Sequence, residues 1–152
     1  MRICTIIVGA GRGKRLNKPI PKAFIEINNI PMIIHTAKKF ENAPSIDEII
    51  LVVPKDRIDS TQNLVKTFSL KKVHKIVAGG EERTDSVYNG LKVAECEIVL
   101  IHDAARPFVS VNLIKKVVDS CKKFDAVVPA ISPKDTLKWI ENDTVIKTLE
   151  RD

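Results

Sequence analysis

Residues 3–15 read ICTIIVGAGRGKR, an apolar run that passes directly into a glycine-rich, basic segment. The part from Thr5 to Val8 is short and rich in isoleucine and valine, as expected of a strand buried on both faces. The glycines that follow leave backbone amides open to a ligand, and the Arg and Lys side chains among them favour an anionic one. This stretch therefore predicts a buried strand that leads into an anion-binding loop.

The same kind of apolar run recurs along the chain, at residues 49–53, 75–78, 98–101 and 126–128. Between the runs lie stretches with the helical spacing of apolar residues, at residues 32–40, 58–68, 87–94 and 112–124. In the last of these, Leu113 and Val117 share one face while Lys115 and Lys116 lie on the other. Strands that alternate with helices predict an α/β fold, a Rossmann-like and mostly parallel sheet with helices on both faces.

The pattern changes near the C-terminus. Residues 136–140 and 144–148 are rich in β-branched and aromatic side chains and are joined by Glu141-Asn142-Asp143, which predicts a β-hairpin with a short turn. We divide the chain into a nucleotide-binding α/β domain, residues 1–134, and a projecting β-arm, residues 135–152. A projecting antiparallel pair exposes its edges, so we expect either a partner chain or residues downstream to complete it.

Composition excludes several classes of protein. Hydrophobic residues make up 44% of the 152 residues and charged residues 29%, a balance typical of a folded domain. No apolar run approaches the roughly 20 residues needed to cross a bilayer, so we expect a cytoplasmic protein that does not bind membranes. The net charge is +6, but the basic pairs lie on solvated helix faces and aromatic residues are only 5%, too few to stack bases. We therefore expect no binding of nucleic acid.

The three cysteines, Cys4, Cys96 and Cys121, have neither C-x-x-C nor metal-ligand spacing. An odd number is also a poor basis for a disulfide framework. We interpret all three as buried thiols.

The loops that follow the apolar runs are the places to look for function, because ligands of such sheets bind outside the carboxyl ends of the strands. Five of the six glycines lie in the loops after the first and third runs. The first loop is no dinucleotide fingerprint, which needs glycine in place of Lys14, and no P-loop, which needs Ser or Thr in place of Arg15. A glycine-rich turn flanked by Lys14, Arg15 and Lys22 then suits an extended triphosphate.

Four motifs occur together in this chain: GAGRGKR at 9–15, PK at 21–22, GGEERTDSV at 79–87 and HDAARP at 102–107. With them the chain resembles, over essentially its whole length, the cytidylyltransferase family whose type member acts on 2-C-methyl-D-erythritol 4-phosphate. The resemblance implies a nucleotidyltransferase of isoprenoid precursor synthesis, with CTP and a polyol phosphate as substrates and Mg2+ as cofactor. The products would be a CDP-polyol and pyrophosphate.

The chain departs from the family pattern in three ways. Gly9 stands where the family usually has Ala, and Ala23 where Gln is common. Family members also continue well beyond the position of Asp152, so we expect a C-terminally truncated domain.

The resemblance implies the roles of the nucleotide-binding residues. Arg15 and Lys22 would stabilise the α-phosphate in the transition state, while the amides of Gly11 and Gly13 hold the β- and γ-phosphates. Ala10, Gly80 and Ser86 would contact cytosine, although Ser86 could instead cap the helix that begins near it.

Asp103 ends a buried strand, where an unpaired carboxylate is costly. A metal ion or a substrate hydroxyl would pair with it, as would Arg106 three residues on. The resemblance assigns Asp103 and Arg106 to the substrate, with Asp103 also a candidate metal ligand, whereas His102 is interpreted as a packed strand-end residue. In a homodimer joined through the arm, Thr136 and Arg151 would contact the polyol phosphate of the partner's site.

The chemistry agrees with this pattern. A phosphate monoester is ionised at neutral pH, so the attack needs no base, and the chain has no Ser/His/Asp or Cys/His constellation. Two alternatives remain: a ribitol 5-phosphate cytidylyltransferase, which differs in the polyol pocket, and a non-catalytic nucleotide-binding module. The combination of Arg15, Lys22, Asp103 and Arg106 disfavours the module, because a mere binder has little use for cations at the α-phosphate.

Overall fold

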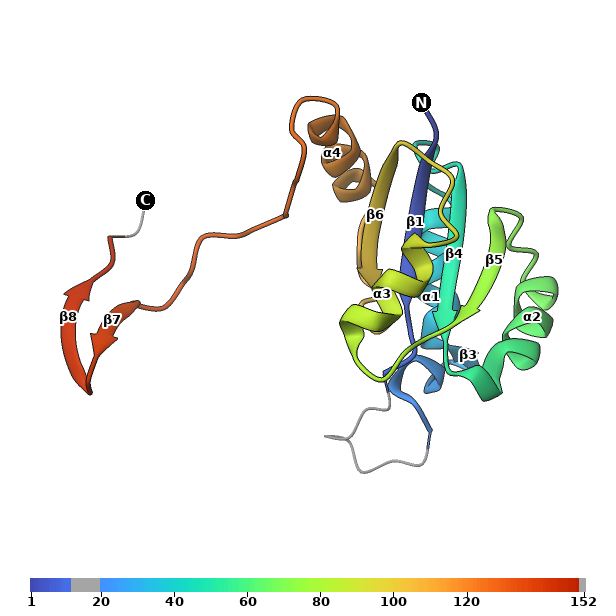
Figure 1. Ribbon diagram of the computed structural model, residues 1–152, viewed down its shortest axis with the longest axis horizontal. Coiled ribbons are helices and arrows are strands. Elements are labelled where there is room, and N and C mark those ends of the chain that lie inside the picture. Colours follow the sequence, from blue (N-terminus) through green and yellow to red (C-terminus); the bar gives the residue numbers. More distant parts are fainter. Residues whose placement is uncertain (12–19, 151–152) are drawn as a thin grey trace.

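The computed structural model describes residues 1–11 and 20–150. In this part of the chain the central sheet has four strands, all parallel, in the order β5-β4-β1-β6 (Figure 1). Their bounds are β1 Ile3–Val8, β4 Glu48–Val53, β5 Val73–Ala78 and β6 Ile98–Asp103. The prediction of a Rossmann-like parallel sheet is confirmed, because these strands are the first four of the predicted runs.

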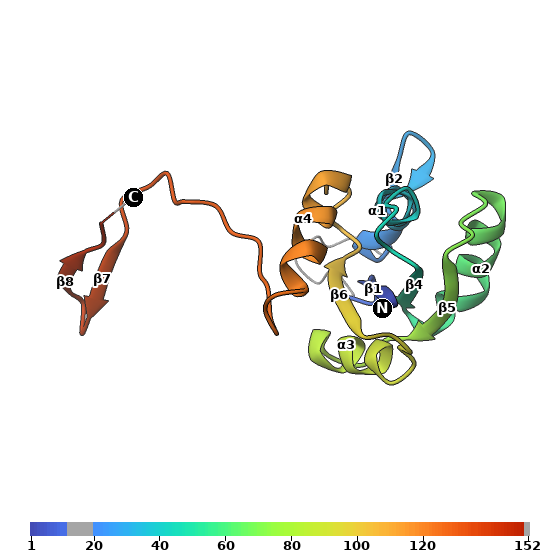
Figure 2. The ribbon, with the colours of Figure 1, turned by 90° about the horizontal axis from the view of Figure 1, so that it is seen from above.

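Helices cover both faces of this sheet, as predicted (Figure 2). Helix α3 (Arg83–Leu91) packs on one face, α1 (Met32–Glu41) and α4 (Val111–Cys121) lie on the other, and α2 (Ile58–Thr67) packs beside β5. Side chains along β1 point alternately to the two faces of the sheet, so Ile7 joins the core under α1 and α4 while Ile6 faces the α3 side. No helix in the described ranges is long and apolar enough to cross a membrane.

A short segment after the first loop presents one predicted site residue. The 3-10 helix η2 (Lys22–Phe24) is held by Ala23 and Phe24, which are both buried in the main core. It leads into the small antiparallel pair β2 (Glu26–Ile27) and β3 (Ile30–Pro31), and a second 3-10 helix, η3 (Lys55–Arg57), follows β4. Lys22 is therefore fixed to the body of the domain by its neighbours.

The predicted strand at residues 126–128 is wrong. Among the described residues these three have no ladder partner, and the chain after α4 runs away from the outer edge of β6, leaving Val128 85% and Ile131 92% exposed. Valine side chains fit the pleated, half-buried surface of a sheet, but a strand forms only where a neighbouring strand can pair with it.

The C-terminal hairpin is confirmed. Strands β7 (Lys138–Glu141) and β8 (Thr144–Thr148) pair antiparallel, and Asn142 and Asp143 take φ values of 45° and 61°, as in a two-residue type I′ turn. Figure 1 shows this β-arm well away from the α/β body, and its strands are exposed along their whole length.

The interpretation of all three cysteines as buried thiols is wrong for two of them. Cys4 and Cys96 form a disulfide across 92 residues of sequence, while Cys121 is a half-buried free thiol. Strands β1 and β6 are neighbours in the sheet, and Cys4 is in register with Val99. This pairing brings the segment before β6, which carries Cys96, close to Cys4. Spacing along the chain carries no signal of this pairing.

Candidate active site

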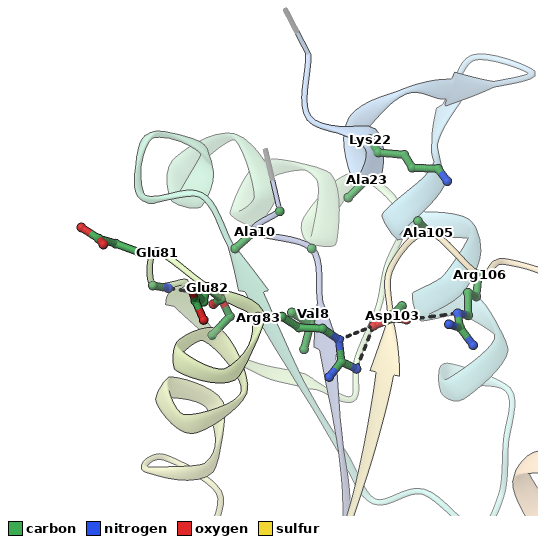
Figure 3. A pocket seen from close by; sticks show the side chains of 14 residues that line it. Val8, Ala10, Lys22, Ala23, Glu81, Glu82, Arg83, Asp103, Ala105 and Arg106 are labelled. Carbon is green, nitrogen blue, oxygen red and sulfur yellow. Dashed lines mark hydrogen bonds and ion pairs between the residues drawn. The ribbon is translucent and has the colours of Figure 1, made fainter. Parts of the chain in front are cut away.

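The loops at the carboxyl ends of the strands enclose a cavity of about 420 Å3. Figure 3 shows the side chains that line it, which come from the first loop, from η2, from the start of α3 and from the end of β6. The predicted site residues that line it are Ala10, Gly11, Lys22, Gly80, Ser86, Asp103 and Arg106. Residues separated by as many as 96 positions in the chain thus share one cavity.

For four other predicted residues the described part of the chain gives no place at the cavity. Gly13, Arg15 and Arg151 lie outside the described residues. Thr136 is exposed on the segment that leads into the arm and does not line this cavity. Their proposed roles stay predictions.

The two glycine-rich loops touch each other directly. A side chain at Gly79 would put its Cβ 2.1 Å from the Cβ of Ala10, so only glycine permits this approach. The loops are also tied to the sheet, because the Gly9 N–H donates to the Val52 carbonyl at 2.7 Å and the Gly79 N–H to the Val53 carbonyl at 2.9 Å. At Gly11, by contrast, a Cβ would meet no atom of the described residues within 4 Å, and Gly11 lines the cavity.

Ser86 fixes the second loop and does not cap the helix. Its side chain is almost fully buried; Oγ accepts from the Gly80 N–H at 3.1 Å and donates to the Glu82 carbonyl at 3.1 Å. The helix cap is Glu82, whose N–H donates to Asp85 Oδ2 at 3.0 Å. A hydroxyl oxygen has two lone pairs, so Ser86 can still accept one hydrogen bond, such as one from an amino group of a base.

Asp103 is held from both sides by arginines. Arg83 Nε and Nη2 donate to its Oδ1 at 3.0 and 2.9 Å, and Arg106 Nε lies 3.0 Å from its Oδ2 (Figure 3). The expected pairing with Arg106 is therefore present, and Arg83 adds a second cation to it. The loop beyond is fixed by Thr36 of α1, whose hydroxyl donates to the Ala104 carbonyl at 2.7 Å.

His102 has the packing role expected of it. Its ring lies against Phe40, with 5.0 Å between ring centroids, and Nε2 is 3.0 Å from the Arg106 carbonyl oxygen. Burial lowers the pKa of His102 below its usual 6.5, and the Arg106 carbonyl opposes this shift. The ring is thus neutral at pH 7 and not available as a charged group.

Arg83 was given no role from the sequence, and neither were Glu81 and Glu82, which also line the cavity. Arg83 stands inside the motif at residues 79–87, at the first position of a helix that follows the double glycine. That position is a local signal for a cation near a ligand. The partner of Arg83, however, is Asp103, which lies 20 residues away at the end of β6.

Three carboxylates among the described residues line this cavity, and each could be a single ligand of a metal ion: Glu81, Glu82 and Asp103. Among the described residues no group of three or more His, Cys, Asp or Glu side chains could hold a metal ion. Mg2+ is commonly bound by one or two carboxylates together with substrate phosphates, so a single carboxylate suffices when a nucleotide is present. The two hydrogen bonds from Arg83 use both lone pairs of Asp103 Oδ1, and Oδ2, which Arg106 meets as an ion pair, keeps acceptor capacity for such a ligand.

Known proteins are similar to this chain in sequence and in fold. The sequence model of the IspD family, 2-C-methyl-D-erythritol 4-phosphate cytidylyltransferase, matches residues 3–152. A protein of that name from Clostridium botulinum (strain Loch Maree / Type A3) is 49% identical over 140 residues, covering 91% of this chain and 61% of the relative. One from Clostridium perfringens (strain SM101 / Type A) is 46% identical over 138 residues, covering 90% of this chain and 61% of the relative.

Solved structures agree. A crystal structure of 4-diphosphocytidyl-2C-methyl-D-erythritol synthase from Anaerococcus prevotii DSM 20548 matches with a TM-score of 0.82 and 32% identity, over 98% of this chain and 63% of the other. The Francisella tularensis 2-C-methyl-D-erythritol 4-phosphate cytidylyltransferase matches with a TM-score of 0.70 and 30% identity, over 100% and 67%. The chain thus spans about three fifths of the length of the curated relatives it matches. On the motifs, the cavity and these matches together, the chain belongs to the 2-C-methyl-D-erythritol 4-phosphate cytidylyltransferase family.

Proposed function

We propose that this chain binds CTP in the cavity and transfers its cytidylyl group to 2-C-methyl-D-erythritol 4-phosphate, a step of isoprenoid precursor synthesis. The observation that carries the proposal is the convergence of the Ala10–Gly11 backbone, Lys22 and the Gly80–Ser86 loop on one cavity with Asp103. Membership of the family supplies the substrate class.

The reaction joins two anions. A phosphate oxygen of the polyol phosphate attacks the α-phosphorus of CTP, a new P–O bond forms, and the bond to the bridging oxygen breaks so that pyrophosphate leaves with the electron pair. No proton has to be removed from the nucleophile, because it is already ionised. Catalysis then depends on fixed cations that meet the charge developing on the α-phosphate and the leaving group, a role we give to Lys22 and Arg15.

We assign the recognition of cytosine to the second loop, residues 80–86. Ser86 retains one acceptor position, and the backbone of Gly80 and of Ala10 lies beside it at the contact of the two loops. Acceptors of this kind suit the amino group of cytosine, which uracil lacks. The amides of Gly11 and Gly13 are assigned to the β- and γ-phosphates.

Mg2+ is proposed as the cofactor, with Asp103 as its protein ligand. When bound, the ion would neutralise part of the phosphate charge and draw the two anions together. Arg106, with Thr136 and Arg151 of a twin subunit, is proposed to contact the polyol phosphate, in a cytoplasmic homodimer joined through the β-arm. The exposed apolar side chains of the arm support this assembly.

The test is direct measurement of CTP binding and of product formation. Calorimetry with CTP, UTP and ATP in the presence of Mg2+ should give selective binding of CTP. Addition of 2-C-methyl-D-erythritol 4-phosphate should release pyrophosphate and give a CDP-polyol by mass spectrometry. Turnover with ribitol 5-phosphate in its place would favour that cytidylyltransferase, and CTP binding without turnover on either substrate would favour a non-catalytic module.

A further inference from the structure

We propose that Arg83 is a positioning residue, which holds Asp103 so that one chosen carboxylate oxygen faces the nucleotide. The inference rests on the proposed function and adds to it a residue that acts through another. It starts from the three hydrogen-bond and ion-pair contacts that the two arginines make with Asp103.

The two arginines make unequal contacts with the two carboxylate oxygens of Asp103. Arg83 gives two N–H groups to Oδ1, at 3.0 and 2.9 Å, and so uses both lone pairs of that oxygen. Arg106 gives one contact to Oδ2, at 3.0 Å. The Arg106 contact is an ion pair without a hydrogen bond, so the acceptor capacity left on Asp103 lies on Oδ2. A ribose hydroxyl or a metal ion that meets Asp103 is thereby directed to a single oxygen.

Arg83 and Arg106 differ in what they connect. Arg106 belongs to the same turn as Asp103, and its N–H donates to the Asp103 carbonyl at 3.1 Å, so its contact is local. Arg83 begins α3, the helix that also carries Ser86, and follows directly on the capping residue Glu82. The contact of Arg83 with Asp103 therefore joins the loop assigned to the base with the strand end assigned to the metal ion.

Stability alone does not explain this pair. The Arg83 side chain is 60% exposed and the Asp103 side chain 29%, and ion pairs in such surroundings contribute little to folding. A positioning role predicts a different outcome, in which loss of Arg83 leaves the fold intact and weakens only what Asp103 binds.

The test is a double-mutant cycle on CTP affinity, measured by calorimetry at fixed Mg2+ with the melting temperature of each variant. Arg83→Met should weaken CTP binding about tenfold, as loss of a hydrogen bond to a charged group does, with an unchanged melting temperature. Asp103→Asn should weaken it at least as much, and the double variant should be no worse than Asp103→Asn. Arg83→Lys, which keeps the charge but not the paired donors, should recover only part of the loss.

The control is Arg57→Met, because Arg57 also pairs with an exposed acid, Asp56, and does not line the cavity. Its CTP affinity should equal that of the unchanged protein. Additive losses in the double variant would overturn the proposal and make Arg83 a direct nucleotide contact. Unchanged affinity of Arg83→Met, or a lowered melting temperature that accounts for the loss, would overturn it too. Failure of the unchanged protein to bind CTP would instead refute the proposed function on which it rests.

Discussion

Lys22 is held at the cavity by its neighbours more than by contacts of its own. It begins η2, the buried Ala23 and Phe24 follow it, and the chain enters through Pro21, whose carbonyl accepts from the Phe24 N–H at 2.8 Å. The backbone that carries this exposed side chain is therefore already in place at the cavity when charge develops on a phosphate, which favours stabilisation of a transition state.

Lys22→Ala should therefore lower turnover about 10²–10³-fold while CTP affinity changes far less. The measurement is pyrophosphate release under steady-state conditions, with calorimetry for CTP. Lys55→Ala is a matched control, because Lys55 also begins a 3-10 helix after a proline but does not line the cavity. A rise in the Michaelis constant for CTP with turnover intact would contradict the role.

Gly79 is required by contact, not by an unusual backbone angle. Gly79→Ala puts a methyl group into Ala10 and toward Ser86 Oγ, so the two loops must separate. We expect a loss of about 1–3 kcal/mol in the free energy of unfolding, together with weaker CTP binding. Urea denaturation would measure it, with Gly11→Ala as a control for stability because its Cβ meets open space. Equal stability of the two variants would count against the contact.

His102 should make stability depend on pH. Burial lowers its pKa in the folded protein below the usual 6.5, so the unfolded chain binds its proton more readily. Stability should thus fall as pH decreases through about 6.5 and level off below the folded pKa. Denaturation curves between pH 5 and 7.5 for the protein and for His102→Gln would measure this, and the variant should lose the dependence. Parallel curves for the two proteins would show that another group is responsible.

At the scale of elements, the disulfide joins the middle of the sheet to its edge. Cys4 is fully buried in β1, and Cys96 lies in the segment between α3 and β6. A crosslink across 92 residues restricts the unfolded chain strongly and keeps the edge strand beside its neighbour.

Cys96→Ser, or reduction, should lower the free energy of unfolding by about 2–4 kcal/mol. Cys121→Ser is the control, because Cys121 is a free thiol and its removal should leave the effect of reductant unchanged. Thermal denaturation with and without dithiothreitol gives the comparison, and alkylation counted by mass spectrometry should find one reactive thiol before reduction. Three thiols without reductant would mean that the disulfide does not form.

At the scale of the whole molecule, the β-arm leaves apolar side chains uncovered. Trp139, Ile140, Val145 and Ile146 are each more than half exposed, and a lone two-stranded hairpin is marginally stable in water. In the homodimer that we propose, these side chains would be covered by the second subunit.

Sedimentation equilibrium should therefore find twice the 17.0 kDa of one chain. Ile140→Lys should shift the protein toward the monomer, since it puts a charge beside Val145, its partner across the hairpin. Tyr88→Ser, which removes an exposed aromatic ring from α3, should leave the mass unchanged. A monomeric unchanged protein would refute the dimer.

The alternation of elements and the loops that carry the site follow from local sequence. The run from Thr5 to Val8 forms a strand because its apolar side chains suit both faces of a sheet, and Asn142-Asp143 turns because those residues accept a positive φ. These are local properties, read from adjacent residues. The apolar pattern predicts a helix at residues 87–94, whereas the helix begins four residues earlier, at Arg83. Its start depends on the Asp85 carboxylate, which accepts a hydrogen bond from the Glu82 N–H, and not on an apolar pattern.

The tertiary structure decided what depends on which strands are neighbours. The order β5-β4-β1-β6 brings Cys4 to Cys96 and the end of β6 to the start of α3, so that Arg83 meets Asp103. The same order leaves the edge of β6 free, and residues 126–128 remain without a partner despite their valines. Propensity and spacing act between residues close in sequence, whereas strand order is set by packing across the whole sheet, and no local pattern records it.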